Sequence, residues 1–180
     1  LHTIPEHHPS RSNTLITLWK IQTNGREDMN YEELLIESDR ENLIVREKDI
    51  PGYGGRIYKN RIAIHKGLST SVEKACVLAE ELGHHYTSYG NILDQSNTSN
   101  RKQELRARAW AYNKQIGLLG LIRAYEHGCR NRFEIAEYLE VTEEVLEECL
   151  VFYRNKYGMC QSIDNYVVYF IPNLVIMKQI

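Results

Sequence analysis

The sequence predicts an α+β chain that is mainly helical and contains a few short strands. Apolar residues recur every 3.6 positions between Val72 and Gly83, which is the period of an amphipathic helix. Ile62 and Ile64 alternate with their neighbours, which is the period of a half-buried strand. The chain has 180 residues, about one domain, and 42% of them are hydrophobic, which allows a core.

The composition argues against several classes of function. The formal charge of -2 gives no overall attraction to nucleic acid or to anionic membranes. No apolar run approaches the roughly 20 residues that span a bilayer, because Pro172 and Asn173 interrupt the best candidate. We therefore expect no membrane partner. The four cysteines form no C-x-x-C pair, and no signal peptide is visible, so we expect reduced thiols and a cytoplasmic location.

The first 28 residues differ from the rest of the chain. They are rich in His, Pro, Ser, Thr and Asn and show weak periodicity. We interpret residues 1–28 as an extension or a disordered arm, with translation hypothesised to start at Met29. Residues 29–180 are then predicted to form a single domain, which includes a helical pair at residues 131–157.

The first elements of this domain are predicted to be a helix over residues 30–39 and a strand that begins at residues 43–45. Two strands follow at residues 55–58 and 61–65, around the turn Lys59-Asn60. We expect the strand at 61–65 to lie at a sheet edge, where it either binds a peptide by strand addition or is simply protected by its charges. His65 either stabilises a developing oxyanion or faces solvent.

Thr70 and Glu73 fit a capping box, so a helix is predicted to begin there and to end near Gly90. Residues 91–100 are predicted to be a polar loop, and Asn100 is expected to cap a helix that runs to about residue 117. The inward face of that helix is predicted to contain Leu105, Ala109, Tyr112 and Ile116. The basic residues of the same helix are expected to form a stripe that is either a solvated face or a surface that attracts an acidic partner: Arg101, Lys102, Arg106 and Arg108.

A short helix is predicted over residues 118–127, followed by two helices capped by Asn131 and Thr142 and one or two strands in the tail. The helical pair has the apolar spacing of a helix-turn-helix. A DNA reader, however, needs a positive recognition helix. The second helix instead exposes acidic residues, so we expect no direct nucleic-acid binding. These acidic residues are Glu143, Glu144, Glu147 and Glu148.

The segment Glu80-Glu81-Leu82-Gly83-His84 resembles the zinc-peptidase motif H-E-x-x-H, with glutamate in place of the first histidine. Residues four apart lie on one helical face, so Glu80 and His84 keep the spacing of two metal ligands. Glu81 takes the place of the general base that activates water. The alternative interpretation is an ordinary solvated face, where carboxylates at helical spacing are common. The motif is expected to lie away from the buried stripe of its helix.

A catalytic zinc site needs three protein ligands and one open position. Glu104 is the best candidate for the third ligand, because it lies in the first turn of the next predicted helix. Small residues beside it, Ala107 and Ala111, would let two helices approach closely. His85 points about 100° away from its neighbour, so it is expected near the surface or behind the site. A second metal site built from His127 and Cys129 with Cys149 or Cys160 has spacings that match no zinc module.

Two motifs occur together: Ala79-Glu80-Glu81-Leu82-Gly83-His84-His85-Tyr86 and Glu104-x-x-Ala107-x-x-Trp110-Ala111. Together they resemble the ImmA/IrrE family of metallopeptidases, especially its phage and mobile-element branch. The resemblance implies a zincin-like fold with a small mixed sheet and one metal site. It implies Glu80, His84 and Glu104 as ligands of Zn²⁺ and Glu81 as the catalytic base. It also implies a metalloendopeptidase that cuts a helix-turn-helix repressor and so relieves repression of a phage or mobile element.

Glu80 departs from the commoner histidine of that family. One more carboxylate lowers the net charge of a zinc site from about +1 to about zero, and oxygen-rich ligation favours harder metals such as Mn²⁺. Mn²⁺ or another divalent metal is therefore an alternative to zinc. The rival functional hypothesis is a non-catalytic pseudo-peptidase that binds and sequesters a repressor.

Overall fold

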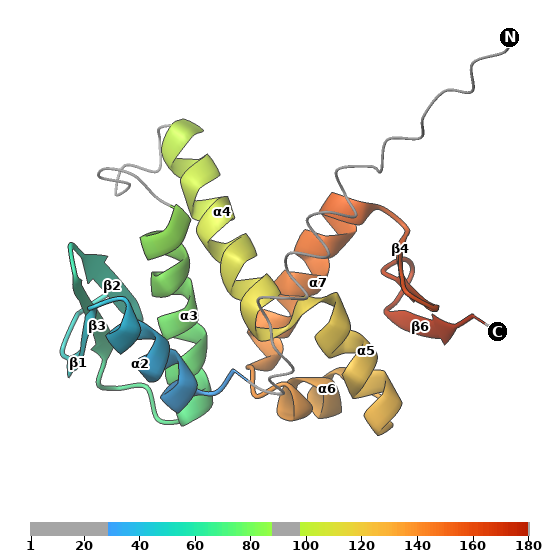
Figure 1. The fold of residues 1–180 in the computed structure, drawn as a ribbon, viewed down its shortest axis with the longest axis horizontal. Coiled ribbons are helices and arrows are strands. Elements are labelled where there is room, and N and C mark those ends of the chain that lie inside the picture. The colour runs from blue at the N-terminus through green and yellow to red at the C-terminus, as the bar shows by residue number, and fades with distance from the viewer. Residues whose placement is uncertain (1–28, 88–97, 180) are drawn as a thin grey trace, which may run out of the picture.

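The computed structural model describes residues 29–87 and 98–179 (Figure 1). Its helices are α2 (Tyr31–Arg40), α3 (Ser71–Thr87), α4 (Thr98–Gln115), α5 (Gly117–His127), α6 (Arg132–Tyr138) and α7 (Glu143–Tyr157). Its strands are β1 (Ile44–Lys48), β2 (Gly55–Tyr58), β3 (Arg61–His65), β4 (Cys160–Ile163), β5 (Tyr166–Tyr169) and β6 (Val175–Lys178). The α+β prediction is confirmed. The proposed arm at residues 1–28 lies outside the described residues.

The first sheet has the strand order β1-β3-β2 and is mixed: β1 pairs with β3 in parallel, and β2 pairs with it in antiparallel fashion. Ile62 and Ile64 are buried, as their alternation predicts. The expectation that residues 61–65 form a sheet edge was wrong. The strand that was expected at residues 43–45 extends to Lys48 and pairs along the whole of β3, so β3 is central and β1 and β2 are the edges.

Helices α3 and α4 lie side by side, and α3 also packs on the first sheet (Figure 1). Gly83 in α3 allows α3 and α4 to approach closely, because a Cβ at this position would lie only 2.3 Å from the carbonyl oxygen of Ala107 in α4. The prediction that small residues allow the two helices to meet is therefore confirmed. The core under this pair contains Leu34, Leu43, Ile62, Ile64, Ala75, Leu78, Ala79, Leu82 and Ala111.

The second half of the chain has its own core, built from α5, α6, α7 and the antiparallel sheet β4-β5-β6. Figure 1 shows this sheet at the opposite end of the molecule from β1, β2 and β3. Tyr153 is fully buried in this core, and Tyr112 of α4 and Ile116, which follows α4, also belong to it. The tail contains three strands and not one or two, because residues 160–163 pair with β5.

The helix caps test the predicted boundaries. Thr70 and Glu73 form the reciprocal capping box, and the side chains of Asn131 and Thr142 cap α6 and α7. Asn100 is not a cap. It lies inside α4, which begins at Thr98, and its side chain is buried.

Two further expectations concern the ends and faces of these helices. Leu105 is not an inward residue but is 56% exposed, since α4 turns the neighbouring stripe with Ala107 and Ala111 toward the protein. The helix stop at Gly90 lies outside the described residues. In the ranges 29–87 and 98–179, no helix combines the length and the apolar character needed to cross a membrane.

Candidate metal centre

The structure brings Glu80, His84 and Glu104 together. The first two lie one turn apart on α3, and Glu104 lies on the adjacent helix α4. His84 Nε2 is 3.4 Å from Glu104 Oε2, and one ligand atom from each of the three residues falls within 4.8 Å of the others. Among the described residues this is the one group of His, Cys, Asp and Glu side chains with that geometry.

The donor set fits a divalent cation. Zinc binds nitrogen and oxygen at about 2.0–2.1 Å in a tetrahedron, which places neighbouring ligand atoms roughly 3.3 Å apart. The measured 3.4 Å between His84 Nε2 and Glu104 Oε2 matches that separation. The side chains of His84 and Glu104 are 10% and 26% exposed, so the cluster lies close to the surface and is only partly shielded from solvent.

Burial and charge set the protonation of the cluster. Burial raises the pKa of Glu80 above its ordinary value, although the guanidinium of Arg108 acts in the opposite direction. Burial also lowers the pKa of His84, although the charge of Glu104 opposes this shift. The neutral imidazole is the form that binds a metal, so burial keeps His84 ready as a nitrogen donor.

Glu81 has a different environment from its neighbours. It is only 8% exposed, so the expectation that the whole motif lies away from the buried stripe was wrong for this residue. Burial, followed by the negative charge of Glu80, raises the pKa of Glu81 to about 8. The backbone of Ile57 in β2 hydrogen-bonds to Glu81 and favours its ionised form. The carboxylate therefore lies between α3 and the edge strand β2.

Gly55, at the start of β2, makes room for that carboxylate. A Cβ at this position would lie 2.9 Å from Glu81 Oε1 and 2.5 Å from Val77 Cγ1. The sequence shows the glycines near residue 55 only as a turn, because their contact with α3 depends on how the sheet packs. Gly55 is thus a residue that supports the site and that sequence reasoning missed.

Arg108 is a second residue whose part in the site sequence reasoning did not identify. It was expected on a solvated basic stripe, but its side chain is half-buried beside the cluster. Arg108 Nε donates to Glu104 Oε1 at 2.9 Å and lies 3.5 Å from Glu80 Oε1. The signal that could have found it is its position four residues after Glu104, where side chains on a helix meet.

The other candidate histidines lie apart from this cluster. His65 on β3 is half-buried and lies 3.5 Å from Asp49, and His85 lies 3.7 Å from Glu41. The ring of His85 also meets the edge of Tyr86, whose hydroxyl donates to Glu37. None of these contacts involves the three candidate ligands.

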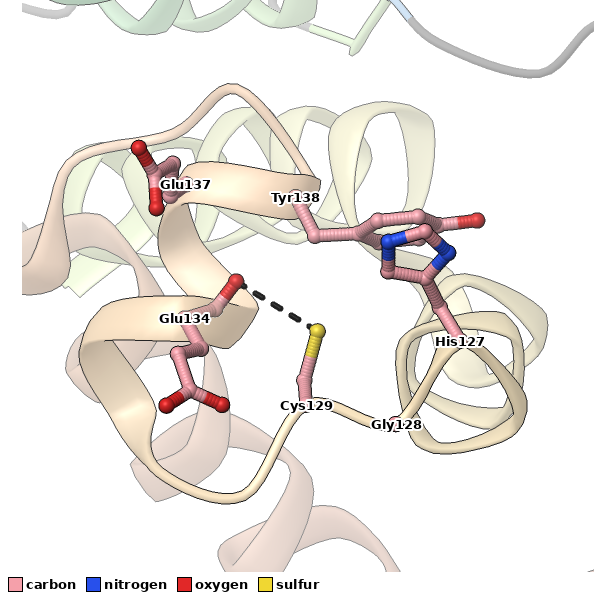
Figure 2. A pocket seen from close by; sticks show the side chains of 6 residues that line it. All are labelled: His127, Gly128, Cys129, Glu134, Glu137 and Tyr138. Atoms are coloured by element: carbon pink, nitrogen blue, oxygen red, sulfur yellow. Dashed lines mark hydrogen bonds between the residues drawn. The ribbon is translucent and has the colours of Figure 1, made fainter.

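His127 and Cys129 line a separate cavity of about 360 Å³ at the end of α5 (Figure 2). The Cys129 thiol donates to the carbonyl of Glu134 at 3.5 Å, and the His127 ring stacks on Tyr138 at 4.6 Å. In Figure 2 the ring of His127 and the sulfur of Cys129 have separate partners. These two side chains therefore take part in packing and in a backbone contact.

Comparison with known proteins agrees with the geometry. Residues 39–150 match the sequence model of the IrrE N-terminal-like domain, a peptidase family. The match covers more than half of the chain and contains Glu80, Glu81, His84 and Glu104. No curated protein and no solved structure matches the chain. The length of the match, together with the cluster on α3 and α4, shows that this chain belongs to the IrrE N-terminal-like domain family of peptidases.

Proposed function

We propose that the chain is a metal-dependent endopeptidase of the zincin type. Glu80, His84 and Glu104 hold the cation, and Glu81 is the general base. The observation that carries this proposal is the convergence of three donor atoms within 4.8 Å of one another, with Glu81 adjacent in sequence on α3. Membership of a peptidase family supports it independently.

A divalent cation in this position supplies a Lewis acid that acidifies water and polarises a peptide carbonyl. The protein supplies the proton transfer. Glu81 accepts the proton of the attacking water at a carboxylate oxygen and returns it to the departing amine. A carboxyl group whose pKa is about 8 in the metal-free site is protonated at neutral pH. With a cation held by Glu80, His84 and Glu104, that pKa would be lower, and Glu81 would then be available as a carboxylate base.

The proposed cation is Zn²⁺, and Mn²⁺ is the principal alternative. The imidazole of His84 suits zinc, whereas the two carboxylates suit harder ions as well. Glu80 and Glu104 together make the set richer in oxygen than a site with two histidines. Metal analysis of protein purified without chelator distinguishes the two ions.

The proposed substrate is a helix-turn-helix repressor, and its cleavage would relieve repression of a phage or mobile element. The sequence motifs that resemble the phage branch of the ImmA/IrrE family support this substrate. The exposed acidic residues Glu143, Glu144 and Glu148 of α7 support a protein partner over nucleic acid. A cytoplasmic location, where such a repressor acts, belongs to the same proposal.

The test is to incubate a candidate repressor with wild-type protein and with Glu81→Gln, each loaded with Zn²⁺ or Mn²⁺. Site-specific cleavage by the wild type alone, with metal and repressor binding retained in the variant, is the expected result. If the wild type binds the repressor but cleaves it with neither metal, the peptidase hypothesis is rejected in favour of a protein that sequesters its partner.

A further inference from the structure

The side chain of Arg108 lies among three carboxylates from three helices. It contacts Glu104 Oε1 at 2.9 Å, Glu80 Oε1 at 3.5 Å and Glu148 Oε2 at 3.7 Å. Glu148 also accepts a hydrogen bond of 2.8 Å from the hydroxyl of Tyr112. The guanidinium is thus held from α3, α4 and α7, unlike a cation on a solvated helix face.

The two oxygens of Glu104 have different neighbours. Oε1 accepts from Arg108, and Oε2 faces His84 Nε2 at 3.4 Å. A partner on one carboxylate oxygen fixes the rotation of the group and thereby aims the other oxygen. Arg108 consequently directs Glu104 Oε2 into the candidate centre.

The charge of the cluster explains why an arginine is useful there. Glu80 and Glu104 carry two negative charges, and neutral His84 carries none. Adding the guanidinium brings the total of the three candidate ligands and Arg108 to −1, which is the charge of a ligand set with two histidines and one glutamate. Glu148, which also contacts the guanidinium, lies outside the candidate ligand set. Arg108 therefore offsets the additional carboxylate that Glu80 brings to the motif.

We infer that Arg108 is a positioning residue that compensates the charge of Glu80 and orients Glu104 for the cation. This inference rests on the proposed metal site. It predicts a signature that a merely structural residue would not give. Removing the positive charge while keeping a hydrogen-bond donor should weaken the metal-free fold but tighten cation binding, because a repulsive charge next to the cation is lost.

The variant Arg108→Gln isolates the charge, because glutamine still donates to a carboxylate. The matched control is Arg106→Gln, the same change on an exposed part of the same helix. Zn²⁺ alone is the probe, with its dissociation constant measured by calorimetry. Arg108→Gln is expected to bind Zn²⁺ about tenfold more tightly than the wild type. The gain is no larger because solvent and salt screen the charge of a half-exposed side chain strongly. The control is expected to bind like the wild type.

Thermal unfolding of the metal-free proteins provides the second measurement. Arg108→Gln should lower the melting temperature in the native background and lower it less in a Glu80→His background, where one carboxylate is already gone. That second background also keeps the test valid if the single variant fails to fold. Equal losses in both backgrounds, or weaker Zn²⁺ binding by Arg108→Gln, would overturn the inference and leave the metal site standing. If the wild-type protein binds no divalent metal, both the proposed function and this inference are rejected.

Discussion

His84 Nε2 and Glu104 Oε2 lie 3.4 Å apart although they belong to different helices. The contact depends on how closely α3 and α4 approach, and Gly83 and Ala107 set that approach. The geometry of the candidate centre is therefore a property of the helix pair and not of the α3 motif alone.

The first prediction concerns the third ligand. Glu104→Ala should reduce bound Zn²⁺ from about one ion per chain to nearly none, because two ligands on one helix do not complete a zinc site. The measurement is metal content after dialysis, with circular dichroism to show that the helices persist. Glu144→Ala, which removes an exposed carboxylate from α7, is the control and should retain the ion. Full metal occupancy in Glu104→Ala would exclude Glu104 as a ligand.

The second prediction concerns the pH dependence of the metal-free protein. The pKa of Glu81 is about 8 in the folded state against an ordinary value of 4.5, so between these values the unfolded chain binds fewer protons than the folded one. Stability from this group is therefore present below pH 4.5 and is lost as the pH rises toward 8.

Glu81→Gln removes this dependence because glutamine does not titrate. Relative to the wild type, the metal-free variant should gain about 2–4 kcal/mol of unfolding free energy between pH 4.5 and pH 8. Urea denaturation at several pH values measures the difference, and saturating Zn²⁺ should reduce it. Parallel stability curves for the two proteins would contradict the shifted pKa.

The third prediction concerns the helix contact. Gly83→Ala would place a methyl group 2.3 Å from the Ala107 carbonyl oxygen, which is backbone and can yield only if α4 moves. We expect a loss of about 1–3 kcal/mol in stability and weaker Zn²⁺ binding. Gly120→Ala in α5 is the matched control, since its new methyl group meets side-chain atoms and no backbone: Leu139 Cδ2 at 3.2 Å and Arg123 at 3.9 Å. Unchanged Zn²⁺ affinity in Gly83→Ala would show that helix spacing does not govern the centre.

The fourth prediction separates the base from the ligands. Gly55→Ala would crowd Glu81 Oε1 while leaving the three ligands untouched, so peptide cleavage should fall about 100-fold with Zn²⁺ affinity nearly unchanged. The neighbouring Gly54→Ala meets Val77 alone and should keep most of the activity. Initial cleavage rates and Zn²⁺ titrations of both variants test this. Equal rate losses in the two variants would mean that the turn, and not the space for Glu81, matters.

Local signals in the sequence predicted local structure well. The strands at residues 55–58 and 61–65 and the Thr70–Glu73 capping box agree with the structure, because each depends on neighbours in sequence. Glu104 was found because the spacing rules of a zinc site require a third ligand from elsewhere. Its convergence with His84 then needed only two small residues at the helix contact.

Features that depend on tertiary packing were not predictable in the same way. The alternation of residues in β3 predicts that one face of the strand is buried. It does not predict that β1 pairs with the edge of β3 that β2 leaves free. Likewise, Leu105 was expected to face inward but is 56% exposed, because α4 turns the stripe with Ala107 toward Gly83 of α3. A helix with few apolar residues carries little information about which side faces inward.

Helix α4 is shared between the two cores: Ala111 packs in the first, and Tyr112, together with Ile116 just after the helix, packs in the second. The C-terminal end of α4, the helix that carries Glu104, is thus packed against the C-terminal half of the molecule. A fragment that ends before α5 would leave Tyr112 and Ile116 without the residues they pack against, and this end of α4 would no longer be held in place. The C-terminal helices and sheet accordingly hold one end of the helix that carries Glu104, so the geometry of the candidate centre depends on residues far beyond the motif on α3.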